Sequence, residues 1–398
     1  MTGHQKRIAS VDVLRGWAIL AVIGTHTFLD AFRPWKYGYN LEAFGVDFDI
    51  YPMIFANGWL GVNLFFVLSG FVLALPFLGK SASEISTGRY YKERLARLLP
   101  LFYVSVAVLA LFLWGDASKA LLKSFELVFF YFTFFPDSWM PSKLPILWSI
   151  GLEFWFSMIL PFIILLSRKV RIEFIALFFL VFCFLFRAVA DELYIAQTDE
   201  SVLYQGQRFL MVLNPYKDYF FGRIDDFVMG ILAAYYYFSR RYKSYSNGLY
   251  FIIALLFLSI SSLLWNHCVI QPGMSYLKSF ATSLFSIGSF ILILNVLSRD
   301  WSKRYSFFRF LGVRCYSIYI IHYLVLKYTF FKDLFRDVTP FEPSYWLVFF
   351  AYFVVMLLIS EFTYQTIEKM GKKWFLTTID QMIVLLINIK HRLFRNQR

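Results

Sequence analysis

The first apolar run of the chain contains Asp12, Arg15 and His26, whose residue types and spacing could serve chemistry. Asp12 and Arg15 are three residues apart, so in a helix they lie on one face, as an ion pair requires. His26 follows Arg15 at a spacing of about three full turns plus 20°, or about 16.5 Å along the helix axis. A permanent cation and a titratable imidazole on one face are expected to line a polar path. Snorkelling to the membrane interface explains Asp12 and Arg15 equally well, but it does not explain His26.

Polar residues in the second apolar run can join that path. Asn63 and Ser69 offer hydrogen bonds within the membrane, and Gly58, Gly61 and Gly70 favour the close approach of another helix. Packing alone also explains these glycines.

A lone carboxylate lies in the apolar run after residue 144. Glu153 is the only acidic residue between residues 144 and 168, and placing a charge in lipid costs about 2.5–3.5 kcal/mol on insertion scales. Three interpretations stay open. Glu153 pairs with a cation such as Arg15 or Arg223, positions the His26 ring, or acts as an acid in its own right.

Basic residues complete the candidate set. Arg94 and Arg97 share a helical face where another apolar run begins, which suits them to gripping phosphate groups. Ordinary loop charge is the favoured interpretation of this segment taken alone. Arg223 and Asp226 open a further run. His322 is interpreted as a hydrogen-bonded structural histidine, because nothing near it in the sequence forms a reactive set with it.

The composition defines the elements that must position these residues. The 398 residues are 59% apolar, 22% aromatic and only 16% charged, whereas soluble domains are about 45–50% apolar and about 25% charged. Because the apolar residues form long unbroken runs, the expected fold class is all-α, a polytopic membrane protein. The net charge of +13 comes from short segments between the runs, which favours anionic membrane lipid as a partner; no nucleic-acid motif is visible. Cys183, Cys268 and Cys315 have no metal-ligand spacing.

Ten stretches are long enough to cross the membrane, since about 30 Å of hydrocarbon needs roughly 20 apolar residues of helix. The run over 125–135 is too short to cross and is expected to be re-entrant or interfacial. The predicted spans are Val11–Phe32, Gly58–Gly79, Leu98–Trp114, Pro145–Ser167, Ile172–Ala190, Gly222–Phe238, Gly248–Trp265, Tyr276–Leu297, Phe308–Phe330 and Tyr345–Ile367.

The Lys and Arg residues that flank these spans predict the orientation. With the N-terminus inside, 24 of them fall in inner segments and 12 in outer ones, so both termini are expected in the cytoplasm. The predicted organisation is a cytoplasmic N-terminus over 1–10, a transmembrane domain over 11–367 and a basic cytoplasmic tail over 368–398. An apolar stretch from Phe375 to Ile389, followed by four basic residues, suits a helix lying on anionic lipid.

Taken in order, these residues resemble the signature of the acyltransferase-3 family of integral membrane acyltransferases. Asp12-Val-Leu-Arg15 followed by His26 is the first match, and the others keep the family's order as far as residue 322. Two departures are a Phe-Trp-Phe segment after Glu153, where members commonly carry a polar residue, and the expected absence of the extra catalytic domain fused to some members. The further matches are Gly61–Gly70, Arg94 and Arg97 before Pro100, Trp148 and Ser149 with Glu153, Arg223 with its acidic neighbours before Met229-Gly230, and Leu311-Gly312 with Tyr316, Ser317, Tyr319 and His322.

The resemblance implies transfer of an acyl group, most often acetyl, from cytoplasmic acyl-CoA to a hydroxyl of a carbohydrate or lipid-linked glycan. The expected location is a bacterial inner membrane, with acyl-CoA as donor substrate and with neither a permanently bound cofactor nor a metal. His26 is the expected general base and Glu153 the second catalytic candidate, while Arg15, Arg94 and Arg97 would bind the donor. The supporting residues are Asp12, Asn63, Ser69, Trp148, Ser149, Arg223 and Asp226.

Other classes of function compete with this interpretation. A transporter of a small polar solute would also place polar residues on many helices, although the sequence has no inverted repeat or paired broken helices. A sensor or scaffold without activity is disfavoured because the candidate residues are intact. A covalent route through Ser69, Ser149 or His26 stays open, but direct transfer is preferred because no serine has an adjacent base in sequence. The acceptor, the length of the acyl chain and the oligomeric state are not indicated.

Overall fold

The computed structural model describes residues 8–32, 57–81, 84–108, 110, 126–134, 144–197, 218–270, 274–299, 304–338 and 342–395. Every regular element in these ranges is helical, which confirms the predicted all-α class. The main helices are α1 (Ala9–Phe32), α4 (Gly61–Ala74), α5 (Thr87–Val108), α7 (Leu147–Leu166), α8 (Ile172–Gln197), α11 (Phe220–Phe238), α12 (Gly248–Ile270), α13 (Ser275–Leu297), α14 (Ser306–Val313), α15 (Cys315–Tyr328), α16 (Phe331–Arg336), α17 (Pro343–Thr363) and α18 (Gly371–Arg395). Short 3₁₀ turns are η2 (Asn57–Leu60), η3 (Leu75–Phe77), η6 (Tyr131–Phe134) and η7 (Arg241–Tyr245), and η8 (Tyr364–Met370) is a π-helix.

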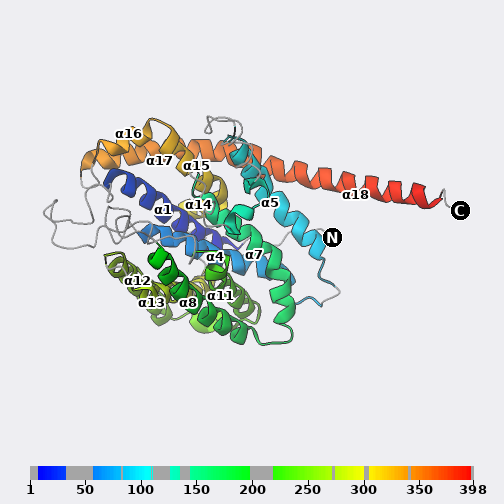
Figure 1. Cartoon of the computed structure of the whole chain (residues 1–398), viewed down its shortest axis with the longest axis horizontal. Coiled ribbons are helices and arrows are strands. Elements are labelled where there is room, and N and C mark those ends of the chain that lie inside the picture. Colours follow the sequence, from blue (N-terminus) through cyan, green and yellow to red (C-terminus); the bar gives the residue numbers. More distant parts are fainter. Residues whose placement is uncertain are drawn as a thin grey trace.

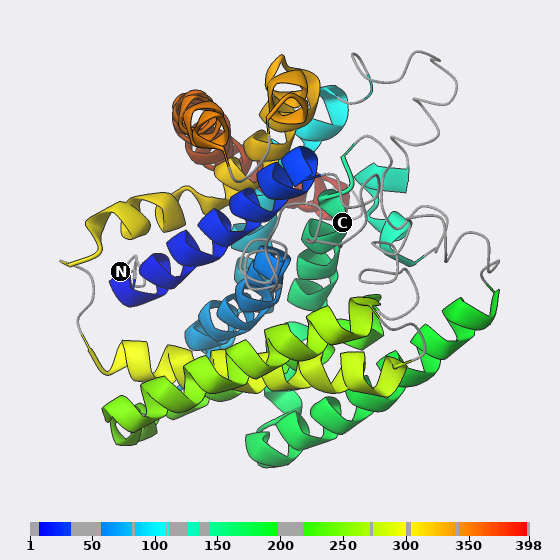
Figure 2. The same cartoon turned by 90° about the vertical axis from the view of Figure 1, so that its left-hand side faces the viewer.

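The helices form two groups with α1 and α4 between them. α8, α11, α12 and α13 pack together on one side, and α14 to α17 lie on the other (Figures 1 and 2). α4 packs against α11 and α1 packs against α14, so these two helices join the groups. The residues expected to do chemistry on α1 and α4 therefore lie at the centre of the molecule.

Six helical segments in the described ranges are long and apolar enough to cross a membrane, and a bent pair makes a seventh candidate. The chain is therefore a multi-pass membrane protein, whereas ten spans and two cytoplasmic termini remain predictions. The six segments are Asn57–Phe77, Leu147–Leu166, Ile172–Ala196, Gly248–Trp265, Ser275–Leu297 and Pro343–Leu386.

Two predicted spans differ from the structure. α5 begins at Thr87, so much of the inner segment expected before Leu98 is helical. The span predicted over Phe308–Phe330 is two helices bent by 79° at Arg314.

In the described part of the short aromatic run, Phe130 and Phe132 are buried, and the Phe130 ring stacks on Phe154 with 4.0 Å between centroids. That run therefore packs against the helical body.

Glycines allow α4 to approach its neighbours closely, as the sequence predicts. A Cβ at Gly70 would lie 2.0 Å from the carbonyl oxygen of Phe227 in α11, and one at Gly230 would lie 1.9 Å from the carbonyl oxygen of Val67. A Cβ at Gly61 would lie 2.5 Å from the carbonyl oxygen of Ala18 in α1. Backbone contact of this kind packs helices without bulky side chains between them.

The C-terminal helix continues α17 through η8 and extends away from the rest of the molecule (Figure 1). Its first half is tied to α5, because Lys372 Nζ lies 3.1 Å from Glu93 Oε2 and Lys92 pairs with Asp380. Trp374 and Met382 are exposed on α18. The contact of this helix with anionic lipid remains a prediction.

Candidate active site

A cavity opens among α1, α4, α5, α7 and α15. It contains six of the residues selected from the sequence, namely Arg15, Ser69, Arg94, Arg97, Ser149 and Glu153. Its other lining residues are Val62, Phe65, Phe66, Leu98, Ile150, Cys315, Tyr316 and Tyr319. Five helices thus bring all three predicted donor-binding residues, Arg15, Arg94 and Arg97, to one place.

Glu153 is held by two hydrogen bonds to one of its oxygens. Arg94 Nη2 donates to Glu153 Oε1 at 2.5 Å, and Ser69 Oγ donates to the same oxygen at 2.7 Å. Arg94 Nε also donates to Ser157 Oγ at 2.8 Å, which fixes the plane of the guanidinium. Of the interpretations left open by the sequence, the structure favours pairing with a cation, and that cation is Arg94 rather than Arg15 or Arg223.

The other two arginines give the cavity its positive charge. Arg15 Nη1 lies 3.6 Å from the buried Asp12 carboxylate, as the three-residue spacing predicts. Arg97 lines the cavity and has no hydrogen bond or ion pair among the described residues. With three guanidinium groups and one carboxylate in the lining, the cavity is suited to an anionic ligand.

His26 lies outside the lining of this cavity, in contact with a second histidine. His26 Nδ1 is 3.2 Å from His322 Nε2, and their ring centroids are 5.1 Å apart. His322 is completely buried, whereas His26 is partly exposed. The sequence suggested only a structural role for His322, because residues 26 and 322 are brought together by the packing of α1 on α15 and by no local spacing.

One tyrosine separates the cavity from the histidine pair. Tyr319 lines the cavity, its hydroxyl lies 2.8 Å from Ser149 Oγ, and its ring centroid is 5.7 Å from that of His322. The polar path expected to contain both Arg15 and His26 is therefore not formed by this cavity alone. Instead, a short chain of side-chain contacts leads from the cavity to His26. Trp148 is buried beside the cavity, where its ring is edge-on to that of the lining residue Phe66, with 6.0 Å between the ring centroids.

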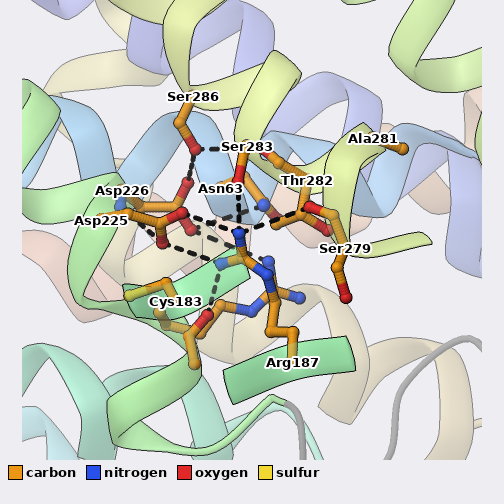
Figure 3. A network of polar contacts seen from close by, with 12 residues as sticks. Asn63, Cys183, Arg187, Asp225, Asp226, Ser279, Ala281, Thr282, Ser283 and Ser286 are labelled. Atoms are coloured by element: carbon orange, nitrogen blue, oxygen red, sulfur yellow. Dashed lines mark hydrogen bonds and ion pairs between the residues drawn. The ribbon is translucent and has the colours of Figure 1, made fainter. Parts of the chain in front are cut away.

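The remaining supporting residues belong to a separate buried network (Figure 3). Asp226 accepts a hydrogen bond from Asn63 Nδ2 at 3.4 Å and another from Ser286, and it lies 3.7 Å from Arg223 Nη1. Arg223 also pairs with Asp218. None of these residues lines the cavity.

The core of this network was missed by the sequence reasoning. Arg187 in α8 binds both oxygens of Asp225 at 2.9 and 2.8 Å and donates to Ser283 Oγ at 2.6 Å. Lys278 pairs with Asp191 at 3.1 Å, and both are buried. Arg187 and Lys278 lie within predicted spans, Ile172–Ala190 and Tyr276–Leu297, and neither is among the residues selected from the sequence. A charged residue within an apolar run was the signal that should have selected them.

Known proteins are similar to this chain over nearly all of its helical region. A family model described as an acyltransferase domain matches residues 8–364, which includes every helix that lines the cavity. The chain belongs to the acyltransferase-3 family. This confirms the resemblance drawn from Arg15, His26 and the matches that follow them. No solved structure matches the chain.

Two curated proteins are similar to this chain over most of its length. The putative peptidoglycan O-acetyltransferase YrhL of Bacillus subtilis is 25% identical over 92% of this chain and 55% of its own length. Peptidoglycan O-acetyltransferase OatA of Listeria monocytogenes is 25% identical over 92% of this chain and 57% of its own length. A protein from the picA locus of Rhizobium radiobacter is 46% identical over a shorter region, 26% of this chain. The chain thus spans about half the length of the first two relatives.

Proposed function

We propose that this acyltransferase moves an acetyl group from cytoplasmic acetyl-CoA to a hydroxyl of a cell-envelope glycan. The observation that carries the proposal is the positively charged cavity, which three guanidinium groups line against one carboxylate, and in which Arg97 makes no hydrogen bond or ion pair with a described residue. Coenzyme A is a polyphosphate, and guanidinium groups bind phosphate by charge-assisted hydrogen bonds. The names of the two similar acetyltransferases support acetyl as the group transferred and a peptidoglycan-type acceptor.

The three arginines have different roles in this proposal. Arg97 is the main ligand of a donor phosphate, since Arg94 is already committed to Glu153. Arg15, held by Asp12, lies beside the same cavity and stabilises negative charge on the donor. Glu153 then acts by fixing Arg94, so that the guanidinium groups keep their places when the donor binds.

His26 is the general base for the acceptor. The acceptor oxygen attacks the carbonyl carbon of the thioester while its proton passes to His26, and the carbon–sulfur bond breaks. Coenzyme A leaves as a thiolate and takes up the proton from the imidazolium. Direct transfer is favoured over an acyl-serine, because Ser69 donates to Glu153 and Ser149 shares its hydrogen bond with Tyr319. Neither serine has a hydrogen bond to a histidine among the described residues.

The test uses purified protein in vesicles with radiolabelled acetyl-CoA and glycan acceptors, including lipid-linked peptidoglycan precursors. Wild-type protein should form labelled glycan, and His26→Ala should lower kcat about 10²- to 10⁴-fold, the usual contribution of a general base. Uptake of a solute without product would instead support a transporter. A His26→Ala protein as active as wild type would contradict the assignment of the base.

Donor binding is tested separately. Arg97→Ala should raise KM for acetyl-CoA about 10- to 100-fold with a smaller change in kcat, since one hydrogen bond to a charged group is worth about 1.5–3 kcal/mol. Arg89→Ala is the matched control, because Arg89 lies exposed on the same helix outside the cavity. Equal KM values for the two variants would contradict phosphate binding by Arg97.

A further inference from the structure

The contact between His26 and His322 fixes where the protons of both rings lie. His322 Nδ1 is 3.2 Å from the backbone carbonyl oxygen of Ile318. A carbonyl oxygen only accepts hydrogen bonds, so Nδ1 is the protonated nitrogen of the neutral ring. The lone pair of His322 is therefore on Nε2, which is the atom that faces His26.

The same reasoning applies to His26. Its Nδ1 lies 3.0 Å from the backbone carbonyl oxygen of Val22 and 3.2 Å from His322 Nε2. Both neighbours are acceptors, so His26 Nδ1 carries the proton and shares it between them. The lone pair of His26 is then on Nε2, on the opposite side of the ring. This tautomer is the one that can accept a proton from a substrate.

We propose that His322 is a positioning residue that holds His26 in this tautomer and orientation. The inference rests on the proposed role of His26 as the base. When Nε2 of His26 takes the acceptor's proton, the ring becomes an imidazolium, and its Nδ1–H bond to His322 Nε2 becomes charge-assisted. His322 remains neutral and keeps its own proton on Nδ1. A carboxylate has this function beside the histidine of serine hydrolases, whereas here a neutral imidazole supplies the acceptor.

The surroundings of the pair support this role. His322 is completely buried, and both of its ring nitrogens are engaged. Its backbone carbonyl accepts a hydrogen bond from Tyr352 at 2.8 Å, which ties α15 to α17 at this residue. The titratable side chains that face the pair are Tyr319, Tyr323 and Lys327 of α15. On α17, the hydroxyl of Tyr345 is hydrogen-bonded to that of Thr27, the residue that follows His26. Among the described side chains that contact the two rings there is no carboxylate that could take over the acceptor role.

Two amide substitutions separate the acceptor from simple packing. The glutamine side chain in His322→Gln is long enough to place its amide oxygen near His26 Nδ1. The asparagine in His322→Asn carries the same amide group, but its side chain is too short to reach His26 Nδ1. His322→Asn should lower kcat about 10- to 100-fold and leave KM for acetyl-CoA within about twofold. General-base catalysis contributes about 10²- to 10⁴-fold, and a His26 ring that is less well positioned still provides part of that rate. His322→Gln should keep kcat within about fivefold of wild type.

A second readout does not depend on activity. Diethyl pyrocarbonate modifies unprotonated imidazole, so its reaction with His26, followed by peptide mass spectrometry against pH without substrates, reports protonation of that ring. Loss of the acceptor disfavours the imidazolium, so the midpoint in His322→Asn should move to lower pH than in wild type or His322→Gln. The kcat–pH profile should move in the same direction.

Tyr352→Phe is the control for packing, because it removes a hydrogen bond to the backbone of His322 without changing either ring. It should leave the pH midpoint of His26 unchanged. Equal kcat and equal midpoints in His322→Asn and His322→Gln would overturn the inference. Wild-type protein that transfers no acetyl group would instead overturn the proposed function, and the modification midpoints would still decide whether His322 orients His26.

Discussion

At the scale of single residues, Glu153 illustrates how a contact decides between roles. Its oxygen accepts hydrogen bonds from Arg94 and Ser69, so the carboxylate is expected to position a cation rather than to exchange protons. Glu153→Gln keeps an acceptor oxygen for both donors. It should therefore lower kcat by less than about tenfold, whereas loss of a true general acid costs about 10²- to 10⁴-fold.

The measurement is steady-state acetyl transfer by Glu153→Gln and Glu153→Ala in the same vesicles. The alanine variant should be the more damaged of the two, because it leaves the Arg94 guanidinium without an acceptor in a largely buried site. If both variants lost activity equally while remaining folded, a proton-transfer role would replace the positioning role.

The sequence predicted some of these residues and missed others for a physical reason. Asp12 and Arg15 form the expected pair because three residues of helix bring them together whatever the rest of the fold does. The contact of His26 with His322, and that of Arg94 with Glu153, depend on how separate helices pack. No spacing along the chain encodes those distances, so the residue types could be selected but their partners could not.

At the scale of helices, α4 and α11 are in backbone contact at Gly70, next to Ser69 of the cavity. Gly70→Val should prevent this packing, because even a Cβ would lie 2.0 Å from a backbone carbonyl oxygen. We expect the variant to lose most of its folded yield and thermal stability in detergent. Gly88→Ala is the matched control, since nothing lies within 4 Å of a Cβ there, and alanine favours a helix by about 1 kcal/mol over glycine. Normal stability of Gly70→Val would mean that α4 and α11 are not in backbone contact.

Helix positions were more predictable than helix ends. Each predicted span overlaps a helix, because long apolar runs must be hydrogen-bonded internally in lipid. The start of α5 at Thr87 was not anticipated, since its first turns are polar and their contacts with α18 are ion pairs of Lys92 and Glu93. The bend at Arg314 was also missed, because the apolar pattern continues through it. Hydropathy reports what faces lipid, and these two features depend on protein contacts instead.

At the scale of the whole molecule, the structure contains two polar centres, one at the candidate active site and one that holds helices together. The cavity and the histidine pair lie among α1, α4, α5, α7 and α15, whereas the Arg187–Asp225 network joins α8, α11 and α13. Asn63 connects the two, because it is on α4 and donates to Asp226. Buried ion pairs are costly to break, at about 3–5 kcal/mol when one partner is removed. The second centre is therefore suited to holding the helices against which the site is built.

The orientation of the molecule decides from which side each substrate arrives. The excess of Lys and Arg in inner segments predicts that both termini are cytoplasmic, which puts the arginine cavity nearer the cytoplasm than His26. A green fluorescent protein fused after Arg398 should fluoresce, whereas alkaline phosphatase at the same position should be inactive because it folds only outside the cytoplasm. In sealed vesicles, acetyl-CoA should then support transfer only when it is supplied on the face that carries the C-terminus. Active phosphatase at this position, or transfer with donor on the opposite face alone, would invert the predicted orientation and with it the direction in which the acetyl group moves.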